Sequence, residues 1–264
     1  MRRAPDGRAD WTVLLPFFNE RDCIAATISS LAGQTTAFTL ILVDNGSSDG
    51  GPAIAQSAAE ALGLEAVLVV EEQRGKVAAL AAGLARVATP FVATCDADTY
   101  YPPHYLAAAE AVLARGHAGA GAYFVDEHSS SLARRLKCAH VMLAACLLRR
   151  QCHAGGAGQA FRTAALRAAG GFDPSRWNLV LEDHEIMHRL MALGTIGYAP
   201  ELWAIPSDRP RRRASVRWSL FERLVYHASS SLAPGWFFNR FLGPRLVRQT
   251  LTSDRLRETH ELAS

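Results

Sequence analysis

The first hundred residues alternate between short apolar runs and segments in which apolar residues recur every three or four positions. The runs are the candidates for buried strands: 11–15, 40–43, 67–70 and 91–95. The segments with helical spacing lie between them: 24–31, 52–62 and 76–87. Strands that alternate with helices of about ten residues form βαβ units, which build a mostly parallel sheet with helices on both faces. We therefore expect an α/β fold.

Turn and cap residues mark the ends of these elements. Pro16 follows the first apolar run, and Gly33 follows the first helical segment, where glycine commonly ends a helix. Asp22 stands where its side chain can cap that helix, and Pro52 stands in the first turn of the next one.

The second half of the chain is less regular. Its predicted elements are a helix over 104–115, a strand over 118–125, a long amphipathic helix over 131–150 and a helix over 182–193. A glycine-rich loop at 155–158 leads into a short extended segment at 159–162.

Polar residues follow each predicted strand of the first half. The four sets are Asn19-Glu20, Asp44-Asn45, Glu71-Glu72, and Asp96 with Asp98. In parallel α/β sheets, ligands bind beyond the carboxyl ends of the strands, where these side chains would meet. We therefore expect one binding site at this edge of the sheet.

Asp96 and Asp98 are the sharpest feature of that edge. Two carboxylates placed two residues apart after a buried strand repel each other, and burying either one is costly without a cation. Mg²⁺ and Mn²⁺ prefer oxygen ligands and are commonly held by one or two carboxylates together with substrate phosphates. A pair of aspartates that shapes the turn before a helix near Pro103 is the simpler alternative.

Several short motifs occur in a fixed order along the chain. Those of the first half are PFFNE at 16–20, VDNGSSDG at 43–50, RGKVAAL at 74–80 and DAD at 96–98. Those of the second half are GAGQAFR at 156–162, GGFD at 170–173 and ED at 182–183. Together, from about residue 11 to residue 200, they resemble the family 2 glycosyltransferases with the GT-A fold. The resemblance implies a Rossmann-like, mostly parallel sheet flanked by helices.

The resemblance also implies a nucleoside-diphosphate sugar donor, with a UDP-sugar as the first expectation, and Mn²⁺ or Mg²⁺ as cofactor. The residues that would hold the base and ribose are Pro16, Asn19, Glu20, Asp44 and Asn45. Lys76 would lie near the base or the phosphates, Asp96 would contact the ribose or the metal, and Asp98 would ligate the metal that bridges the diphosphate.

On the acceptor side, the resemblance implies an inverting transfer to a hydroxyl group, in the synthesis of a polysaccharide, a glycolipid or another glycoconjugate. Glu182 and Asp183 are the candidate catalytic residues, with Asp183 as the general base that deprotonates the hydroxyl. The acceptor site would be shaped by Gly156, Gly158 and Trp177. Without the preceding motifs, Asp183 would be interpreted as the N-cap of its helix.

Two other functions fit parts of the sequence. His184, Glu185 and His188 match HExxH, in which two histidines on one helix face bind Zn²⁺ and the glutamate is the base of a metallopeptidase. A non-catalytic protein that binds nucleotide sugars is the second alternative. A dinucleotide oxidoreductase is set aside, because the first strand is followed by residues 16–20 and not by GxGxxG.

Processive members of the resembled family carry a QxxRW motif and transmembrane helices. Here Arg217 and Trp218 are present, but Ala214 stands at the glutamine position. No apolar stretch approaches the roughly 18 residues of a membrane span, the longest candidate being 138–148. These departures predict a non-processive enzyme.

The net charge of +3 is unevenly distributed. Residues 209–248 contain nine arginines and a single acid, Glu222. Such a segment favours an anionic partner, which would be a membrane surface, a lipid phosphate or a diphosphate; a solvated basic helix face is the alternative. We expect no nucleic-acid partner.

The N-terminus carries two arginines but no apolar core of a signal peptide, and the five cysteines include no CxxC pair. We therefore expect reduced thiols and a cytoplasmic protein, with peripheral contact at the inner membrane face through the arginine-rich segment. The expected organisation is an N-terminal tail over 1–10, a GT-A domain over 11–205, divided into a nucleotide-binding half (11–100) and an acceptor half (101–205), and a basic helical extension over 206–264.

Overall fold

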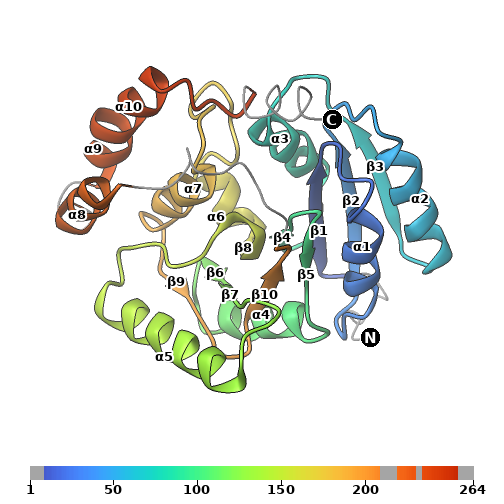
Figure 1. Cartoon of the computed structure of the whole chain (residues 1–264), viewed down its shortest axis with the longest axis horizontal. Helices are drawn as coiled ribbons and strands as arrows, with labels where there is room; N and C mark the ends of the chain where they lie inside the picture. The colour runs from blue at the N-terminus through green and yellow to red at the C-terminus, as the bar shows by residue number, and fades with distance from the viewer. Residues whose placement is uncertain (1–8, 209–218, 230–233, 255–264) are drawn as a thin grey trace.

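The computed structural model describes residues 9–208, 219–229 and 234–254, which fold around one large sheet (Figure 1). The strand order of this sheet is β3-β2-β1-β4-β8-β6-β9. Four strands come from the first half of the chain and are mutually parallel: β1 (Trp11–Phe17), β2 (Phe38–Asp44), β3 (Ala66–Val70) and β4 (Phe91–Thr94). The other three are β6 (Gly119–Gly121), β8 (Gln159–Arg162) and β9 (Ile196–Gly197). Only β8 runs antiparallel to its neighbours, so the expected mostly parallel α/β fold is confirmed.

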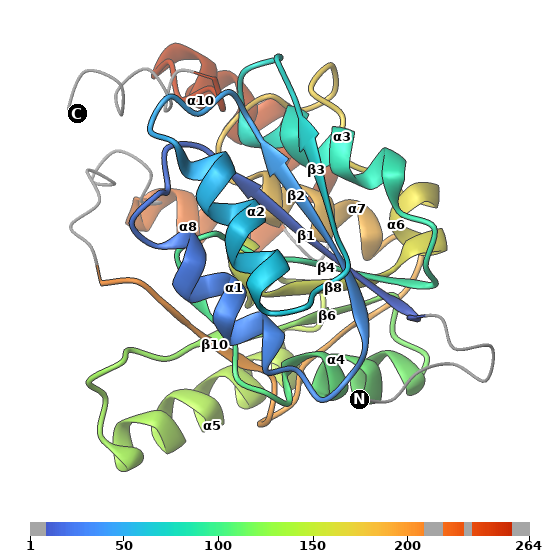
Figure 2. The ribbon, with the colours of Figure 1, turned by 90° about the vertical axis from the view of Figure 1, so that its right-hand side faces the viewer.

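Helices cover both faces of the sheet (Figure 2). One layer consists of α1 (Ile24–Ala32), α2 (Gly51–Ala61) and α4 (Tyr105–Ala114). The opposite layer consists of α3 (Lys76–Arg86), α6 (Thr163–Ala168) and α7 (Glu182–Leu190). Side chains of β1 point alternately to the two helix layers. Val13 and Leu15 pack with the first layer, and Leu14 packs with the second.

The helix boundaries agree with the sequence to within a few residues, but one cap prediction is wrong. Cys23 is the N-cap residue of α1, and no side chain caps that helix. Asp22 is exposed, and its carboxylate lies 3.9 Å from Nε of Arg21 instead. Gly33 and Pro52 stand where expected, at the end of α1 and in the first turn of α2.

The predicted strand over 118–125 is in fact two strands that belong to different sheets. β6 pairs with β8 and β9, whereas β7 (Tyr123–Phe124) pairs with β10 (Trp203–Pro206) in a small sheet that also contains β5 (Thr99–Tyr100). The break falls at Ala122, whose backbone N–H donates to the carbonyl of Gly158 at 2.7 Å. The glycine-rich loop that contains the short helix η1 (Gly156–Gly158) therefore redirects the chain.

Helix α5 (Ser131–Leu147) lies at the outside of the molecule (Figure 1). Ser130 caps it through a hydrogen bond from the N–H of Ala133 to its hydroxyl. Its inner side, with Cys138, Val141 and Met142, packs on Tyr123 and Val125 near β7.

The last described elements form a second hydrophobic cluster. They are α8 (Leu220–Ser229), α9 (Pro234–Trp236), the π-helix η3 (Phe237–Leu242) and α10 (Gly243–Arg248). Phe237 and Phe238 are fully buried there, together with Trp177 from the loop before α7. None of the helices in the described ranges has the length and apolar character needed to cross a bilayer.

After α10 the chain returns to the first half of the fold. The carbonyl of Leu251 accepts from the N–H of Val180, and Ser253 donates its N–H to the carbonyl of Asn178. The hydroxyl of Ser253 then accepts from the N–H of Val77 at 3.4 Å, in the first turn of α3.

Candidate active site

The polar residues that follow β1 and β2 are held together at one edge of the sheet. Asn19 donates its backbone N–H to Oγ of Ser47 at 3.0 Å, and its side-chain oxygen accepts from the N–H of Ser48 at 2.8 Å. A carboxylate oxygen of Asp44 accepts from the N–H of Ser47 at 2.9 Å. Pro16 is the next-to-last residue of β1, paired with Val43 of β2. The predicted meeting of these strand ends is confirmed.

Asn45 connects this edge to the loop before α3. Its buried amide nitrogen donates to the carbonyl oxygens of Glu71 (3.0 Å) and Gln73 (2.8 Å), and its oxygen accepts from the N–H of Gly75 at 2.8 Å. Gly75 has φ of +120°, a conformation that side chains other than glycine's rarely adopt. The contacts of Asn45 therefore fix the point at which Lys76 begins α3.

Lys76 reaches from the start of α3 to two acidic side chains. Its ammonium nitrogen lies 2.6 Å from Oδ1 of Asp96, after β4, and 3.5 Å from Oε1 of Glu182, at the start of α7. Burial disfavours the charged ammonium, but Asp96 and Glu182 outweigh it and raise the pKa of Lys76 above its ordinary value. Three elements far apart in the sequence thus meet at one cation.

Asp96 and Asp98 have different partners. Asp96 pairs with Lys76, and its backbone N–H donates to the hydroxyl of Tyr101, which in turn donates to the carbonyl of Ala157. Asp98 is only 8% exposed, and Thr99 Oγ1 donates to its Oδ1 over 3.4 Å. The donor set offered here consists of carboxylate oxygens alone, which fits Mg²⁺ or Mn²⁺. No group of three or more His, Cys, Asp or Glu side chains that could hold a metal converges anywhere in the described ranges, this edge included.

Asp183 lies in the first turn of α7. Its Oδ1 accepts from the backbone N–H of His184 at 2.8 Å and contacts Nδ1 of the same histidine at 3.0 Å. Burial opposes the carboxylate, but the charge and hydrogen bonds of His184, helped by Lys76, lower the pKa of Asp183 to about 2. Burial likewise opposes the imidazolium, but Asp183 raises the pKa of His184 above its ordinary value. The N-cap residue of α7 is Leu181, so Asp183 is not the cap.

The glycine-rich loop approaches this pair closely. A methyl group at Gly156 would lie 3.1 Å from Cβ of Asp183 and 3.4 Å from the ammonium nitrogen of Lys76. Gln159 at the start of β8 donates its amide to the carbonyl of Asp183 at 2.9 Å. Gly156 therefore borders the acidic cluster, whereas Gly158 packs on Ala122.

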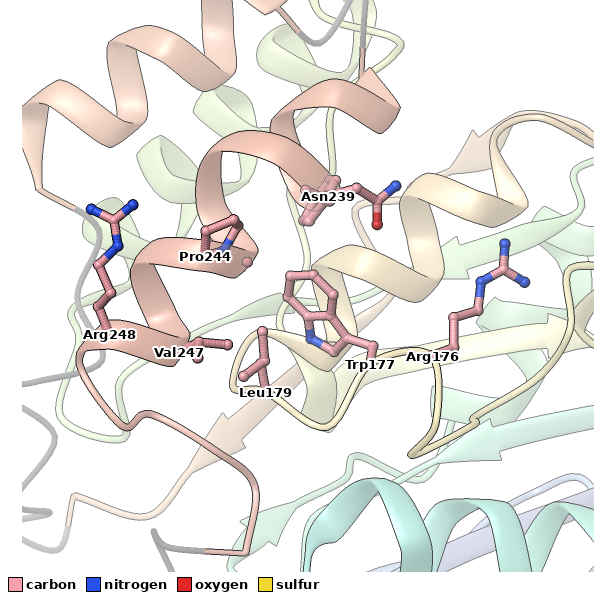
Figure 3. Close-up of a pocket in the computed structure, with 9 residues that line it drawn as sticks. Arg176, Trp177, Leu179, Asn239, Pro244, Val247 and Arg248 are labelled. Atoms are coloured by element: carbon pink, nitrogen blue, oxygen red, sulfur yellow. The ribbon is translucent and has the colours of Figure 1, made fainter.

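The structure places Trp177 away from this cluster, in the C-terminal hydrophobic core. Its indole N–H donates to the carbonyl of Val180 at 3.2 Å, and its ring meets Phe238 edge-on. Trp177 also forms part of a groove of about 450 Å³, in which Arg176 and Arg248 lie on opposite sides (Figure 3).

The HExxH residues have other partners than a zinc ion. Glu185 is buried and accepts two hydrogen bonds from the guanidinium of Arg189, at 2.8 Å from Nε and 2.8 Å from Nη2. His188 stacks on Phe238 with ring centroids 5.1 Å apart, and His184 pairs with Asp183. Because Glu185 is committed to Arg189, it is unsuited to act as a peptidase base.

Sequence reasoning missed three contributors to the site. Tyr101 joins the turn after β4 to the glycine-rich loop, Gln159 positions the backbone of Asp183, and His184 pairs with the Asp183 side chain. The sequence indicates His184 only as a candidate zinc ligand within HExxH. Its position directly after the ED motif was the available signal.

Comparison with known proteins identifies the class of protein that this fold and site define. The family model for glycosyl transferase family 2 matches residues 12–170, which is more than half of the chain. The chain belongs to this family and is a glycosyltransferase.

Two curated relatives match over about a third of the chain. An undecaprenyl-phosphate 4-deoxy-4-formamido-L-arabinose transferase from Sodalis glossinidius is 33% identical over 97 residues, which cover 35% of this chain and 30% of the relative. The succinoglycan biosynthesis protein ExoU from Rhizobium meliloti is 29% identical over 94 residues, which cover 36% of this chain and 28% of that protein. The matched part of this chain thus spans less than a third of either relative.

Solved structures share the fold over most of the chain. The mannosyltransferase PcManGT from Pyrobaculum calidifontis, solved with GDP-Man and Mn²⁺, superposes with a TM-score of 0.70 at 23% identity and covers 90% of this chain and 69% of that one. Glucosyl-3-phosphoglycerate synthase from Mycobacterium tuberculosis was solved with Mn²⁺, UDP and glucosyl-3-phosphoglycerate. It superposes with a TM-score of 0.54 at 21% identity, and the match covers 90% of this chain and 81% of that one. These similarities show the GT-A fold.

Proposed function

We propose that this glycosyltransferase moves a sugar from a nucleoside-diphosphate donor, with a UDP-sugar as the first candidate, to an acceptor hydroxyl with inversion at the anomeric carbon. The observation that carries the proposal is the meeting of Lys76, Asp96, Glu182 and Asp183 at the carboxyl edge of the sheet. A donor diphosphate needs positive charge beside it and an acceptor hydroxyl needs a base, and this cluster offers both.

On the donor side, the base and ribose would be bound by the residues that follow β1 and β2: Pro16, Asn19, Glu20, Asp44 and Asn45. Two of the fold relatives were solved with GDP-Man or UDP, which supports a nucleotide at this edge. Because the amide of Asn45 already holds the loop before α3, we expect its contribution to the donor to be the placement of Lys76.

Mn²⁺ or Mg²⁺ would be held by Asp98 together with Asp96. When bound, the metal would supply positive charge to the diphosphate leaving group. Lys76 supplies a second positive charge from its place beside Asp96, 2.6 Å away. The manganese in the two fold relatives supports a divalent cofactor.

Asp183 would be the general base. With a pKa near 2 it is ionised at neutral pH, and its second oxygen, Oδ2, is the one closer to the glycine-rich loop, where a methyl group at Gly156 would lie 3.5 Å away. A hydroxyl on that side would lose its proton to Asp183 as it attacks the anomeric carbon. Glu182 would hold Lys76 in place beside it.

The acceptor would be a hydroxyl in a polysaccharide, a glycolipid or another glycoconjugate. Gly156 would border its site beside the base, whereas Gly158, packed on Ala122, and Trp177, in the C-terminal core, would act only through the loops that carry them. Several curated relatives are named for transfer to undecaprenyl phosphate, which supports an acceptor attached to a membrane. Such an acceptor fits a cytoplasmic enzyme with peripheral contact at the inner membrane face through the arginine-rich segment 209–248.

The organisation remains a proposal as well: a GT-A domain over 11–205 and a basic extension over 206–264, acting non-processively. Ala214, Arg217 and Trp218, on which the non-processive prediction depends, lie outside the described residues. So does much of the arginine-rich segment.

The test compares Asp98→Asn and Asp183→Asn, with exposed Asp126→Asn as the matched control. Asp98→Asn should weaken metal-dependent donor binding. Asp183→Asn should bind the donor normally and transfer sugar about 100-fold more slowly or worse, because it lacks a base. Parental transfer rates in Asp183→Asn would show that the base is assigned wrongly. Donor binding without transfer or hydrolysis in the parent would favour a non-catalytic protein.

A further inference from the structure

Helix α5 has two apolar faces, and only one of them is covered by described residues. The inner face packs on β7 through Cys138, Val141 and Met142. The outer face, here called the leucine face, exposes 60–71% of each of its members: Leu132, Leu136, Leu143 and Leu147. At about 100° per residue these four leucines fall within about 60° of one another, in a row about 22 Å long. A row of large apolar side chains so exposed marks an interaction surface.

Positive charge flanks the leucine face. Arg135 and Lys137 are both exposed and project about 90–110° to either side of it at about 100° per residue. Arg149 and Arg150 follow the helix and are exposed as well. The whole stretch 128–172 contains six arginines and one lysine but no aspartate or glutamate. The cations therefore border the leucine face without any acidic side chain from the same stretch to offset them.

Helix α8 presents a second apolar patch on the same side of the molecule. Leu220, Phe221 and Leu224 expose 80%, 56% and 67% of their surfaces. Figure 1 shows α8 at the upper left and α5 at the lower left, both on the side away from α2. The segment that follows α5 is attached to α8, because the N–H of Cys152 donates to the hydroxyl of Tyr226 at 3.0 Å.

We propose that the leucine face of α5 lies on the surface of an anionic phospholipid bilayer, with the apolar patch of α8 beside it. Leucines in one row would enter the headgroup–acyl boundary, while the long stems of Arg135 and Lys137 would place their charges among the lipid phosphates. A second copy of this chain fits less well, because a two-fold contact through the same face would bring its cations against each other.

The leucine face of α5 lies outside the arginine-rich segment 209–248, in which the sequence placed membrane contact, whereas α8 belongs to that segment. It also goes beyond the transfer reaction, and its test needs no sugar nucleotide. A failed transfer assay and a failed binding assay would therefore be distinguishable.

The experiment measures co-sedimentation of the full chain with vesicles of phosphatidylcholine, with and without phosphatidylglycerol. The leucine variant is Leu136→Ser/Leu143→Ser, and the charge variant is Arg135→Gln/Lys137→Gln. The control is Leu62→Ser/Val67→Ser, which removes two apolar side chains of 44% and 46% exposure at α2 and β3. Melting temperatures of all variants are compared with the parent, since exposed positions should leave folding unchanged.

We expect the parent and the control to bind vesicles that contain phosphatidylglycerol, and to release them as salt is raised. The leucine variant should bind at least tenfold more weakly, and the charge variant should lose the preference for anionic lipid. Equal binding by parent and leucine variant, or no binding by the parent, would overturn the proposal. A parent dimer that the leucine variant converts to monomers would also overturn it, and would assign the face to a second copy.

Discussion

Asp183 and His184 are adjacent in sequence and joined through their side chains, and each changes the proton affinity of the other. Asp183 has a lowered pKa of about 2, so its contribution to folding stability is present above about pH 4 and is lost as the pH falls towards 2. His184 has a raised pKa, so its contribution is complete below about pH 6.5 and is lost as the pH rises through the higher folded value. The pair should stabilise the fold most between about pH 4 and 6.5.

The variant His184→Gln tests this pair. At pH 5 we expect it to lower the free energy of unfolding by roughly 1–2 kcal/mol relative to the parent, because a charged pair is lost from a mostly buried position. At pH 9 the gap should be smaller, because the parent imidazole loses its proton as the pH rises through its raised pKa. Urea denaturation at both pH values measures the gap. A gap that is the same at both would mean that His184 is not charged in the folded protein.

Lys76 holds two carboxylates that would otherwise face each other without a cation. In Lys76→Met we expect donor binding to weaken at least tenfold and the fold to lose about 1–3 kcal/mol. Mn²⁺ should raise the melting temperature of this variant more than that of the parent, since the metal can replace part of the missing charge. Thermal melts with Mn²⁺ and with EDTA give the comparison, and Lys137→Met on exposed α5 is the matched control. An equal response to Mn²⁺ in variant and parent would contradict the prediction.

At the scale of elements, apolar runs predicted the parallel strands β1, β2 and β4 well, because a strand buried on both faces must be apolar throughout. The edge strand β3 carries an apolar run as well, although much of it is exposed. The run over 118–125 predicted one strand where there are two, and the cause lies in another part of the chain. Its division into β6 and β7 depends on the loop at 155–158, in which the carbonyl of Gly158 accepts a hydrogen bond from the N–H of Ala122. A contact between segments about 36 residues apart leaves no periodic signal in either of them.

The same loop contains two glycines, Gly156 and Gly158, whose substitution should affect different properties: transfer activity for Gly156 and folding stability for Gly158. A methyl group at Gly158 would lie 2.8 Å from Cβ of Ala122, so Gly158→Ala should cost about 1–3 kcal/mol of stability through overpacking. Gly156→Ala would crowd Asp183 and Lys76 at 3.1 and 3.4 Å, so it should lower transfer while the fold loses less than 1 kcal/mol. Gly235→Ala, where no atom of the described residues lies within 4 Å of the added methyl group, is the control.

Urea denaturation and transfer assays on the three variants check this division. The expectation fails if Gly156→Ala unfolds as readily as Gly158→Ala, or if it transfers sugar at the rate of Gly235→Ala.

At the scale of the whole molecule, the sequence predicted which strand ends meet at one edge of the sheet but not what connects them to the second half. The edge formed by Asn19, Asp44, Asn45 and Asp96 follows from strand order in any parallel sheet. The bridge from Lys76 to Glu182 depends on how the second half packs over the first, and no local pattern encodes that packing. Trp177 shows the same limit, since its burial against Phe238 depends on helices more than fifty residues further along.

Binding of a nucleotide should stabilise the whole fold. We expect one of UDP, GDP, dTDP, CMP and ADP to raise the melting temperature by about 5–10 °C at 100 times its dissociation constant with Mn²⁺. EDTA should abolish the shift if Asp98 holds the metal. If no nucleotide shifts the melting temperature and chelation alone unfolds the protein, the result would favour the alternative of a zinc site at His184 and His188.

The contact between Ser253 and the first turn of α3 has a consequence for how the protein matures. Polypeptides leave the ribosome N-terminal end first, and folding begins before synthesis ends. The four parallel strands are therefore made early, but the turn that presents Lys76 gains its hydrogen bond from Val77 to Ser253 only when residue 253 has been translated. A nascent chain can thus hold a formed sheet while the first turn of α3 still lacks this hydrogen bond. The support of that turn would then wait until residue 253 has been made.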